Sequence, residues 1–594
     1  MNGLSGAEIA RIQSLRAYNG GYIRLRPLVF NSDAHEASSL PPKELVEMSR
    51  FSLVALVLLI PVSVLAAGSP VPAQVATINS MIEEGWASYE IKPAPEVDDA
   101  TWCRRAFLDI IGRIPKVEEL QEFMSASSRT RRAELVERLL YDDRYTEEYA
   151  GHWATIWSNL LIGRGGGNDR RSMISREGMQ KYLRDSFASN KPYNTMVFEL
   201  VTATGSTKPG TANFNGAVNF LIDKVNEDKG VLATSSTSRI FLGQQVQCTQ
   251  CHNHPFNQWK QQMFWEFNSF FRQTRSLRRF VDGTGDIDHA ELVNQDFGGE
   301  ANDVEDALIF YELRNGLTRV AYPVFTDGTE IPKSGLVSDV NRRDELGRLI
   351  LQSEYLDKMI VNRMWSIFLG HGFTKPVDDL GPHNPASHPE LLETLANEFR
   401  SSSYDLKQLI TWVTLSRPYG LSPVLGSNNE IDDPSIGEMP KFSRFYLRQI
   451  SAEQLYQSML TATEATSSGS YEEQEQQRRR WLQQFVVAFG TDEGDEATTF
   501  NGSIPQALML FNGELTKKAT STAKGSFIDG IASRGRKPLD RLNELFIAGL
   551  ARRPTLNEKK AASALLLARG GDEKQMLQDM WWAILNSNEF IMQH

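Results

Sequence analysis

Residues 387–399, with the sequence SHPELLETLANEF, point to the fold class of this chain. Ser387 followed three residues later by Glu390 is typical of a capping box, in which a hydroxyl and a carboxylate close the first turn of a helix. The apolar residues that follow recur at the spacing of one helix face: Leu391, Leu392, Leu395 and Phe399. This stretch therefore predicts an amphipathic helix.

The same helical periodicity recurs along the chain. Apolar stripes at i, i+3 and i+4 occur in two further segments: Leu135, Val136, Leu139 and Leu140 in one, and Leu356, Met359, Ile360, Ile367 and Phe368, ending at Gly370, in the other. Strand patterns occur at residues 307–313 and 317–325, which flank the hairpin dipeptide Asn315-Gly316. We therefore expect a mainly α, multi-helix protein with a small β-hairpin insert around 306–332.

Two stretches near opposite ends of the chain resemble each other. Residues 107–119 and residues 545–558 each contain an apolar helix, a basic residue, a proline that can start a second helix, and an acid in its first turn. A single copy at each end does not make a solenoid, which needs contiguous repeats. The sequence predicts a shared helix–turn–helix unit.

The N-terminal region predicts export. Residues 51–67 are uncharged and mostly apolar, and turn residues follow them, as in a signal peptide that occupies 48–67. An uncleaved anchor is the alternative, although the run is short for a membrane span. Residues 1–47 resemble neither a targeting peptide nor a folded unit, so we expect the true start to be Met48. After cleavage no apolar run is long enough to cross a bilayer.

The composition argues against two kinds of partner. The chain of 594 residues has a net charge of −11, whereas nucleic acid or an anionic lipid surface would require a basic face. We therefore expect neither as a partner.

The pentapeptide Cys248-Thr-Gln-Cys251-His252 carries the most specific chemistry in the chain. Cys-x-x-Cys-His is the spacing at which two thiols attach c-type haem and the adjacent imidazole ligates its iron. The chain has only three cysteines, and Cys103 lies in a helical pattern as a small buried apolar residue. We therefore expect haem c at this motif.

Several questions about this motif stay open at the level of sequence. The sixth iron ligand could be Met263, His152, His383 or His388, or could be absent. A zinc or iron ion held by Cys248, Cys251, His252 and His254 is one alternative to haem. A disulfide between the two cysteines is the other.

A weaker candidate site lies further along the chain. Asp378 and Asp379 could serve as acid and base or bind a cation, but adjacent carboxylates on a strand or turn point in opposite directions. His388 follows the expected N-cap Ser387, where the helix dipole disfavours its cationic form, and a surface position is expected for it. A metal-dependent enzyme that uses either aspartate is thus a third hypothesis.

Several long motifs, in order, resemble one known family. They are Arg104–Gly112 with Pro115, Tyr149–Trp153, Phe241–Gly243 leading into Cys248–Phe256, Asn362–Trp365, Pro376–Asp379, Asn384–Leu392 and Arg552–Thr555. The chain is similar to the large secreted planctomycete proteins in which a cytochrome-C-like domain of unknown function precedes a planctomycete-specific domain of unknown function. Residues 282–303 are rich in Gly, Asp and Asn and are expected to form a loop or linker, so we place a domain boundary there. We therefore expect a helical cytochrome-C-like domain over 77–280, a linker with the hairpin over 281–338, and a helical planctomycete-specific domain over 339–594.

The leading hypothesis is an exported redox protein, periplasmic or extracellular, that exchanges electrons with a redox or other periplasmic protein. The alternative is a non-redox protein of the same compartment with a Cys/His structural metal site or a disulfide, linked to polysaccharide handling. Whether the chain is an enzyme is left open, since neither a Gly-x-Ser-x-Gly elbow nor a His-Glu-x-x-His helix is present.

Overall fold

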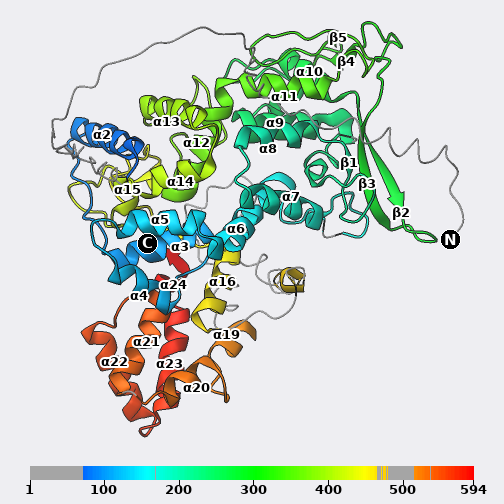
Figure 1. Ribbon diagram of the computed structural model, residues 1–594. Helices are drawn as coiled ribbons and strands as arrows, with labels where there is room; N and C mark the ends of the chain where they lie inside the picture. The colour runs from blue at the N-terminus through cyan, green and yellow to red at the C-terminus, as the bar shows by residue number, and fades with distance from the viewer. Residues whose placement is uncertain are drawn as a thin grey trace, which may run out of the picture. The chain divides into compact units, whose positions relative to one another are not determined.

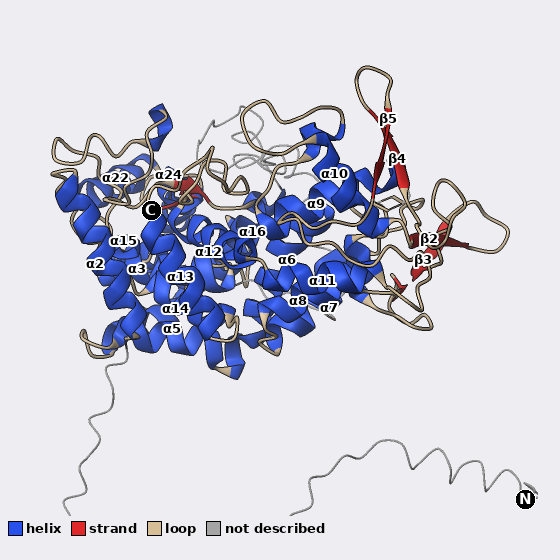
Figure 2. Cartoon of the chain, turned by 90° about the horizontal axis from the view of Figure 1, so that it is seen from above, coloured by secondary structure: helices blue, strands red, loops and turns tan. Residues whose placement is uncertain are grey.

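The computed structural model describes residues 71–167, 169–225, 227–464, 470, 473–476, 478, 514–535 and 537–594. Helices dominate this part of the chain (Figures 1 and 2), so the mainly α fold class is confirmed. The helices up to the β-hairpin insert are α2 (Ala73–Ser88), α3 (Asp99–Ile111), α4 (Val117–Ser125), α5 (Arg131–Tyr141), α6 (Asp143–Ile162), α7 (Arg176–Ala188), α8 (Tyr193–Thr202), α9 (Val231–Leu242) and α10 (Gln261–Asn268). Those after it are α11 (Arg342–Gln352), α12 (Glu354–Leu369), α13 (Pro389–Ser401), α14 (Leu406–Thr414), α15 (Arg417–Gly420), α16 (Ala452–Ala462), α19 (Glu514–Ala519), α20 (Phe527–Ser533), α21 (Pro538–Leu550), α22 (Leu556–Ala568), α23 (Glu573–Leu585) and α24 (Asn588–Ile591).

The predicted helical stripes form buried helix faces. The stripe that begins at Leu135 is the buried face of α5, and the stripe that begins at Leu356 is the buried face of α12. Gly370 ends α12 with φ of 87°, a left-handed conformation that glycine adopts without a Cβ penalty.

The helix after Ser387 is confirmed, but its capping box is wrong. α13 begins at Pro389, so the N-cap is His388 and no side chain caps the helix. Proline is favoured at the first helical position because its missing N–H would have no intrahelical partner there. The helix therefore starts at Pro389, one residue later than a capping box of Ser387 and Glu390 would place it.

The predicted β-hairpin is confirmed. Strands β4 (Ile309–Glu312) and β5 (Thr318–Ala321) pair antiparallel on either side of the Asn315-Gly316 turn. Both strands are shorter than the sequence pattern suggested.

A longer hairpin was missed. Strands β2 (Thr274–Phe280) and β3 (Ile287–Asn294) pair antiparallel, and the short strand β1 (Gly205–Ser206) adds to β3. β3 lies in the Gly/Asp/Asn-rich stretch that was expected to be a loop, and only its Ala290 and Leu292 are fully buried. A strand with two buried side chains has too weak an apolar alternation to stand out in the sequence.

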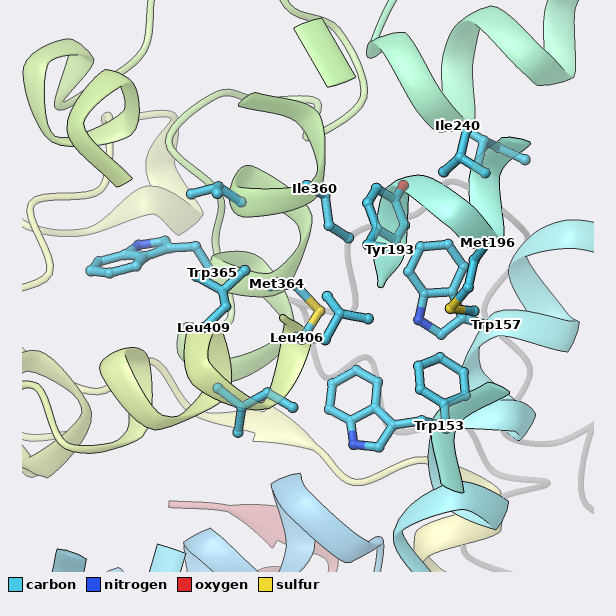
Figure 3. Close-up of a cluster of buried hydrophobic side chains, with 14 of the residues drawn as sticks. Trp153, Trp157, Tyr193, Met196, Ile240, Ile360, Met364, Trp365, Leu406 and Leu409 are labelled. Carbon is cyan, nitrogen blue, oxygen red and sulfur yellow. The ribbon is translucent and has the colours of Figure 1, made fainter. Parts of the chain in front are cut away.

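The main hydrophobic core draws on both halves of the chain. Trp157 of α6 and Tyr193 of α8 have ring centroids 5.5 Å apart, and Tyr193 lies 6.4 Å from Phe399 of α13. Figure 3 shows this cluster, with Trp153 and Met196 facing Met364 and Leu406. Side chains on both sides of the expected linker 281–338 thus pack into one core, and the division into two domains stays a prediction.

A second core forms around α21 and α23, and α3 contributes to it. Leu108 and Ile114 from the α3–α4 region pack with Leu545, Trp581 and other apolar residues of the C-terminal helices. The chain end returns to the same place, because β7 (Met592–Gln593) pairs with β6 (Arg448–Gln449) and Arg104 donates to the Phe590 carbonyl at 2.8 Å.

The similar stretches near the two ends form the same helix–turn–helix unit, as predicted. The prolines do not start the second helices, however, because α4 begins at Val117 and α22 at Leu556, two residues after Pro115 and Pro554. Arg113, between α3 and α4, binds Glu119 and Glu148, and Arg552, between α21 and α22, binds Glu558 and Glu589. In both units the first of these glutamates lies six residues after the arginine and accepts from the N-cap backbone N–H of the second helix.

The expected extension 1–47 and signal peptide 48–67 lie outside the described residues. Within the described part of the chain, no helix combines the length and the apolarity that a bilayer span requires.

Candidate functional site

The Cys-x-x-Cys-His motif lies in a short loop between α9 and α10, two helices that contact each other (Figure 1). α9 ends at Gly243, whose φ of 62° turns the chain sharply. A 3₁₀ helix at Gln247–Gln250 then presents Cys248 and Cys251, which are both exposed and both free thiols. Cys103, by contrast, is fully buried in α3, and burial raises the pKa of its thiol.

Helix α10 holds this loop in place. Trp265 donates its indole N–H to the Gln250 carbonyl at 3.1 Å, and Gln261 donates to the same carbonyl at 3.1 Å. The side chain of Asn253 accepts from the backbone N–H of Gln261 at 3.0 Å. The loop is therefore fixed on both sides of Cys251, although both thiols are exposed.

His252 and His254 have opposite hydrogen-bond roles. Nδ1 of His252 lies 2.7 Å from the carbonyl oxygen of Asn253, which can only accept, so Nδ1 carries the proton and Nε2 keeps a lone pair. Nδ1 of His254 instead accepts from the backbone N–H groups of Phe256 and Asn257. A neutral imidazole that accepts at Nδ1 carries its proton on Nε2, so only His252 is prepared as a metal ligand in this arrangement.

A second segment, residues 378–383, lies against this loop although it is more than a hundred residues away in sequence. The backbone N–H of Leu380 donates to the Gly243 carbonyl at 2.6 Å. Asp378 accepts from Arg239 at 3.2 Å and from Gln245 at 2.8 Å. A Cβ at Gly243 would lie 2.8 Å from Leu380, so the close approach requires glycine.

Asp379 directs His383 toward the cysteine loop. Its Oδ1 lies 2.9 Å from Nε2 of His383, and the ring of His383 lies 6.3 Å from the ring of His254. Partial burial and the neighbouring His383 lower the pKa of His254. Asp378 and Asp379 thus face different partners, as expected for adjacent carboxylates, and they do not form an acid–base pair with each other.

The candidate sixth ligands lie in different surroundings. Met263, in α10, packs beside the apolar cluster of Val246, Trp259 and Phe264 next to the loop. His383 lies beside His254. The remaining two have other neighbours: His152 packs on Trp153 in α6, and His388 packs between Phe373 and Phe442.

His388 is not the surface histidine that the sequence suggested. Burial lowers its pKa to about 4. Its imidazole therefore stays neutral in the folded protein over most of the pH range.

The donor set at the loop fits the attachment of haem. Two free, exposed thiols and one imidazole with an available Nε2 are the groups that a c-type haem requires. Phe256, 84% exposed, lies beside them, whereas Trp259 is buried in the small core below. Among the described residues, no group of three or more His, Cys, Asp or Glu side chains is arranged to hold a metal ion.

Sequence reasoning missed Arg239, Gln245 and the close approach of Asp378 and His383. The motif Phe241–Gly243 was noted only as part of the family resemblance, and nothing in it indicates which distant segment contacts Gly243. Long-range contacts of this kind leave no trace in local periodicity.

Comparisons with family models divide the chain into two matched regions. The model of PSCyt2, a protein of unknown function (DUF1549), matches residues 77–276. The model of PSD1, also a protein of unknown function (DUF1553), matches residues 342–566. Searches of curated proteins and of solved structures found no match. The chain thus belongs to the planctomycete-type two-domain family in which a PSCyt2 region precedes a PSD1 region.

Proposed function

We propose that the chain is an exported redox protein in which Cys248 and Cys251 attach a c-type haem through thioethers and His252 ligates its iron. The observation that carries the proposal is the tautomer of His252. Its Nδ1–H donates to the Asn253 carbonyl at 2.7 Å, which leaves Nε2 as the ligating atom. Haem, when bound, would supply one-electron chemistry.

The chain's own residues position and protect this site. The carbonyl of Asn253 orients His252, and the bonds from Trp265 and Gln261 to Gln250 hold the thiol-bearing turn. A hydrogen bond from the Nδ1–H of a ligating histidine strengthens its basicity and fixes its ring. The exposed loop suits electron exchange with a partner protein.

Export is part of the proposal. The apolar run of residues 51–67 supports it, and so does the requirement that c-type haem be attached outside the cytoplasmic membrane in bacteria. The partner is then a redox protein of the periplasm or the extracellular space.

The test is a pyridine haemochrome spectrum of protein exported from a host with c-type cytochrome maturation. We expect a c-type spectrum from the native chain and none from the Cys248→Ser, Cys251→Ser double variant, with Cys103→Ser as the cysteine control. His252→Gln should change the native absorption spectrum, recorded before pyridine is added, whereas His254→Gln should leave it unchanged. A colourless native protein would reject the proposal.

The same preparation distinguishes the alternatives. A bound zinc or iron ion in stoichiometric amount, lost in the double variant, would instead assign a Cys/His metal site. Fewer free thiols than three after denaturation, with no metal, would assign a Cys248–Cys251 disulfide and a non-redox role such as one in polysaccharide handling.

A further inference from the structure

A cavity of about 700 Å³ lies away from the cysteine loop, where the α3–α4 turn, α6 and α16 meet. Two of the motifs that carry the family resemblance contribute to it, through Gly112 and Pro115 in one and His152 in the other. The haem proposal uses none of these residues. Pockets of a few hundred to a thousand cubic ångströms are the size that small organic ligands occupy.

His152 is one of the polar groups that line this cavity. Its ring lies edge-on to Trp153 and hydrogen-bonds to the Asp109 backbone, and a Cβ at Gly112 would lie only 2.4 Å from its Nδ1. Burial lowers the pKa of His152 to about 4. The imidazole is thus neutral at neutral pH, and since a backbone carbonyl holds its N–H, its other nitrogen is an acceptor.

The carboxylate of Glu453, which also lines the cavity, can accept hydrogen bonds as well. Glu453, at the start of α16, accepts from Asn159 at 3.2 Å. Burial would raise its pKa, but the guanidinium groups of Arg164 and Arg478 outweigh this effect and lower it. Glu453 is therefore ionised and keeps further lone pairs for a ligand, because a carboxylate offers about four acceptor positions.

The guanidinium groups that line the cavity already have carboxylate partners. The pairs are Arg113 with Glu119 and Glu148, Arg478 with Glu475, and Arg534 with Glu464 and Glu544. An anionic ligand bound to one of these guanidinium groups would have to displace its carboxylate, and a cationic ligand at Glu453 would have to compete with Arg164, whose guanidinium lies 3.5 Å from that carboxylate. The other charged residues of the lining, Lys116, Glu118 and Glu147, are exposed, so solvent screens their charges. A neutral ligand rich in hydroxyl groups avoids both costs, because each hydroxyl donates once and accepts twice and can bind the outer atoms of intact pairs.

We propose that this cavity binds a neutral, hydroxyl-rich organic ligand of the size of one or two sugar rings. His152 and Glu453 accept from its hydroxyl groups. Tyr456, Leu460 and Phe527 also line the cavity and supply apolar surface for its carbon skeleton. This site is independent of the haem proposal and stands whether or not haem is attached.

The test is saturation-transfer NMR on the full exported chain with a matched set of sugars. Glucose, galactose, mannose and maltose are the neutral probes, and glucosamine and glucose 6-phosphate are their cationic and anionic counterparts. We expect signals from at least one neutral sugar and weaker or no signals from the charged pair.

Two variants locate the binding. Gln457→Trp places a large side chain at an exposed position of α16 that lines the cavity, and Gln352→Trp makes the same change at an exposed position at the end of α11. The signals should disappear in the first variant and persist in the second, with circular dichroism showing that both fold. Absence of binding by every neutral sugar, a preference for a charged one, or binding that survives Gln457→Trp would overturn the proposal.

Discussion

At the scale of single residues, two glycines have the same backbone conformation but different neighbours. Gly112 ends α3 with φ of 81°, and Gly370 ends α12 with φ of 87°. A Cβ at Gly370 would meet Tyr446 at 3.4 Å, close to ordinary contact, whereas a Cβ at Gly112 would lie 2.4 Å from His152. Gly112 is therefore required for the close approach of His152 as well as for the turn.

The matched substitutions Gly112→Ala and Gly370→Ala separate these two effects. Gly370→Ala should lower the free energy of unfolding by about 1 kcal/mol, the cost of a left-handed alanine. Gly112→Ala should cost about 1–3 kcal/mol more, because His152 must move and give up its contact with Trp153 and its hydrogen bond to the Asp109 backbone. Denaturant unfolding measures both, and equal losses would show that His152 is not held against the turn.

Residue-level patterns in the sequence predicted some features of the site and missed others. The cysteine motif indicated the two thiols and His252 as a proposed ligand, because that interpretation depends on spacing alone. The predicted surface position of His388 was wrong, because the aromatic residues Phe373 and Phe442, which pack against it, come from other parts of the chain. A side chain's burial is set by neighbours that sequence spacing does not identify.

At the scale of elements, the two helix–turn–helix units repeat one ion-pair design with different burial. The Arg113 side chain is 7% exposed and the Arg552 side chain is 28% exposed. Hydrogen bonds donated by Arg552 lower the pKa of Glu558 to about 2. Hydrogen bonds and charge from Arg113 likewise lower the pKa of Glu119, against the effect of burial. The sequence predicted these units because each helix carries its own start signal.

Removing the arginine should therefore have unequal effects. Arg113→Met should lower the free energy of unfolding by about 3 kcal/mol, because it leaves a buried Glu119 without its counter-charge. Arg552→Met should cost about 1 kcal/mol, since solvent can replace the partner at a more exposed site. Comparison of the two unfolding midpoints tests this, and an equal or reversed order would contradict the role of burial.

Elements with weak local patterns were the ones that sequence analysis missed. β2 and β3 form a regular antiparallel pair, yet β3 buries few apolar side chains and follows a glycine-rich turn. β4 and β5 were found because an Asn-Gly dipeptide marks their turn. The turn dipeptide, more than the composition of the strands, made the β4–β5 hairpin predictable and left the β2–β3 hairpin unpredicted.

At the scale of the whole molecule, three histidines resist protonation in the folded state. Burial lowers the pKa of His152, His388 and His594 to about 4 in each case. In the unfolded chain an imidazole titrates near about 6.5. Between these values the unfolded state binds more protons than the folded state, so stability rises with pH across this window.

The free energy of unfolding should accordingly fall as the pH is lowered from about 6.5 to about 4, by up to about 4 kcal/mol per pH unit if all three contribute. His388→Leu should flatten this dependence by about 1.4 kcal/mol per pH unit, since it removes one of the three protons. Unfolding curves over the window check both statements. An unchanged slope in the variant would show that His388 is accessible to protons in the folded protein.

The arrangement of the whole molecule explains why the sequence predicted the cysteine motif but not its contact with residues 378–383. The cysteine loop lies in the PSCyt2 region and residues 378–383 lie in the PSD1 region, yet Gly243 and Leu380 are joined by a 2.6 Å hydrogen bond. Each motif could be recognised alone. Their meeting depends on the shared core that draws α6, α8, α12 and α14 together (Figure 3).

The central claim is that this loop holds a covalent haem, and the most direct measurement is the intact mass of the exported chain from a host with c-type cytochrome maturation. The account predicts the mass of the processed polypeptide plus one haem, with the added mass on the peptide that contains Cys248 and Cys251 and with Cys103 as the remaining free thiol. A mass equal to the polypeptide alone, with Cys248 and Cys251 still titratable, would contradict it.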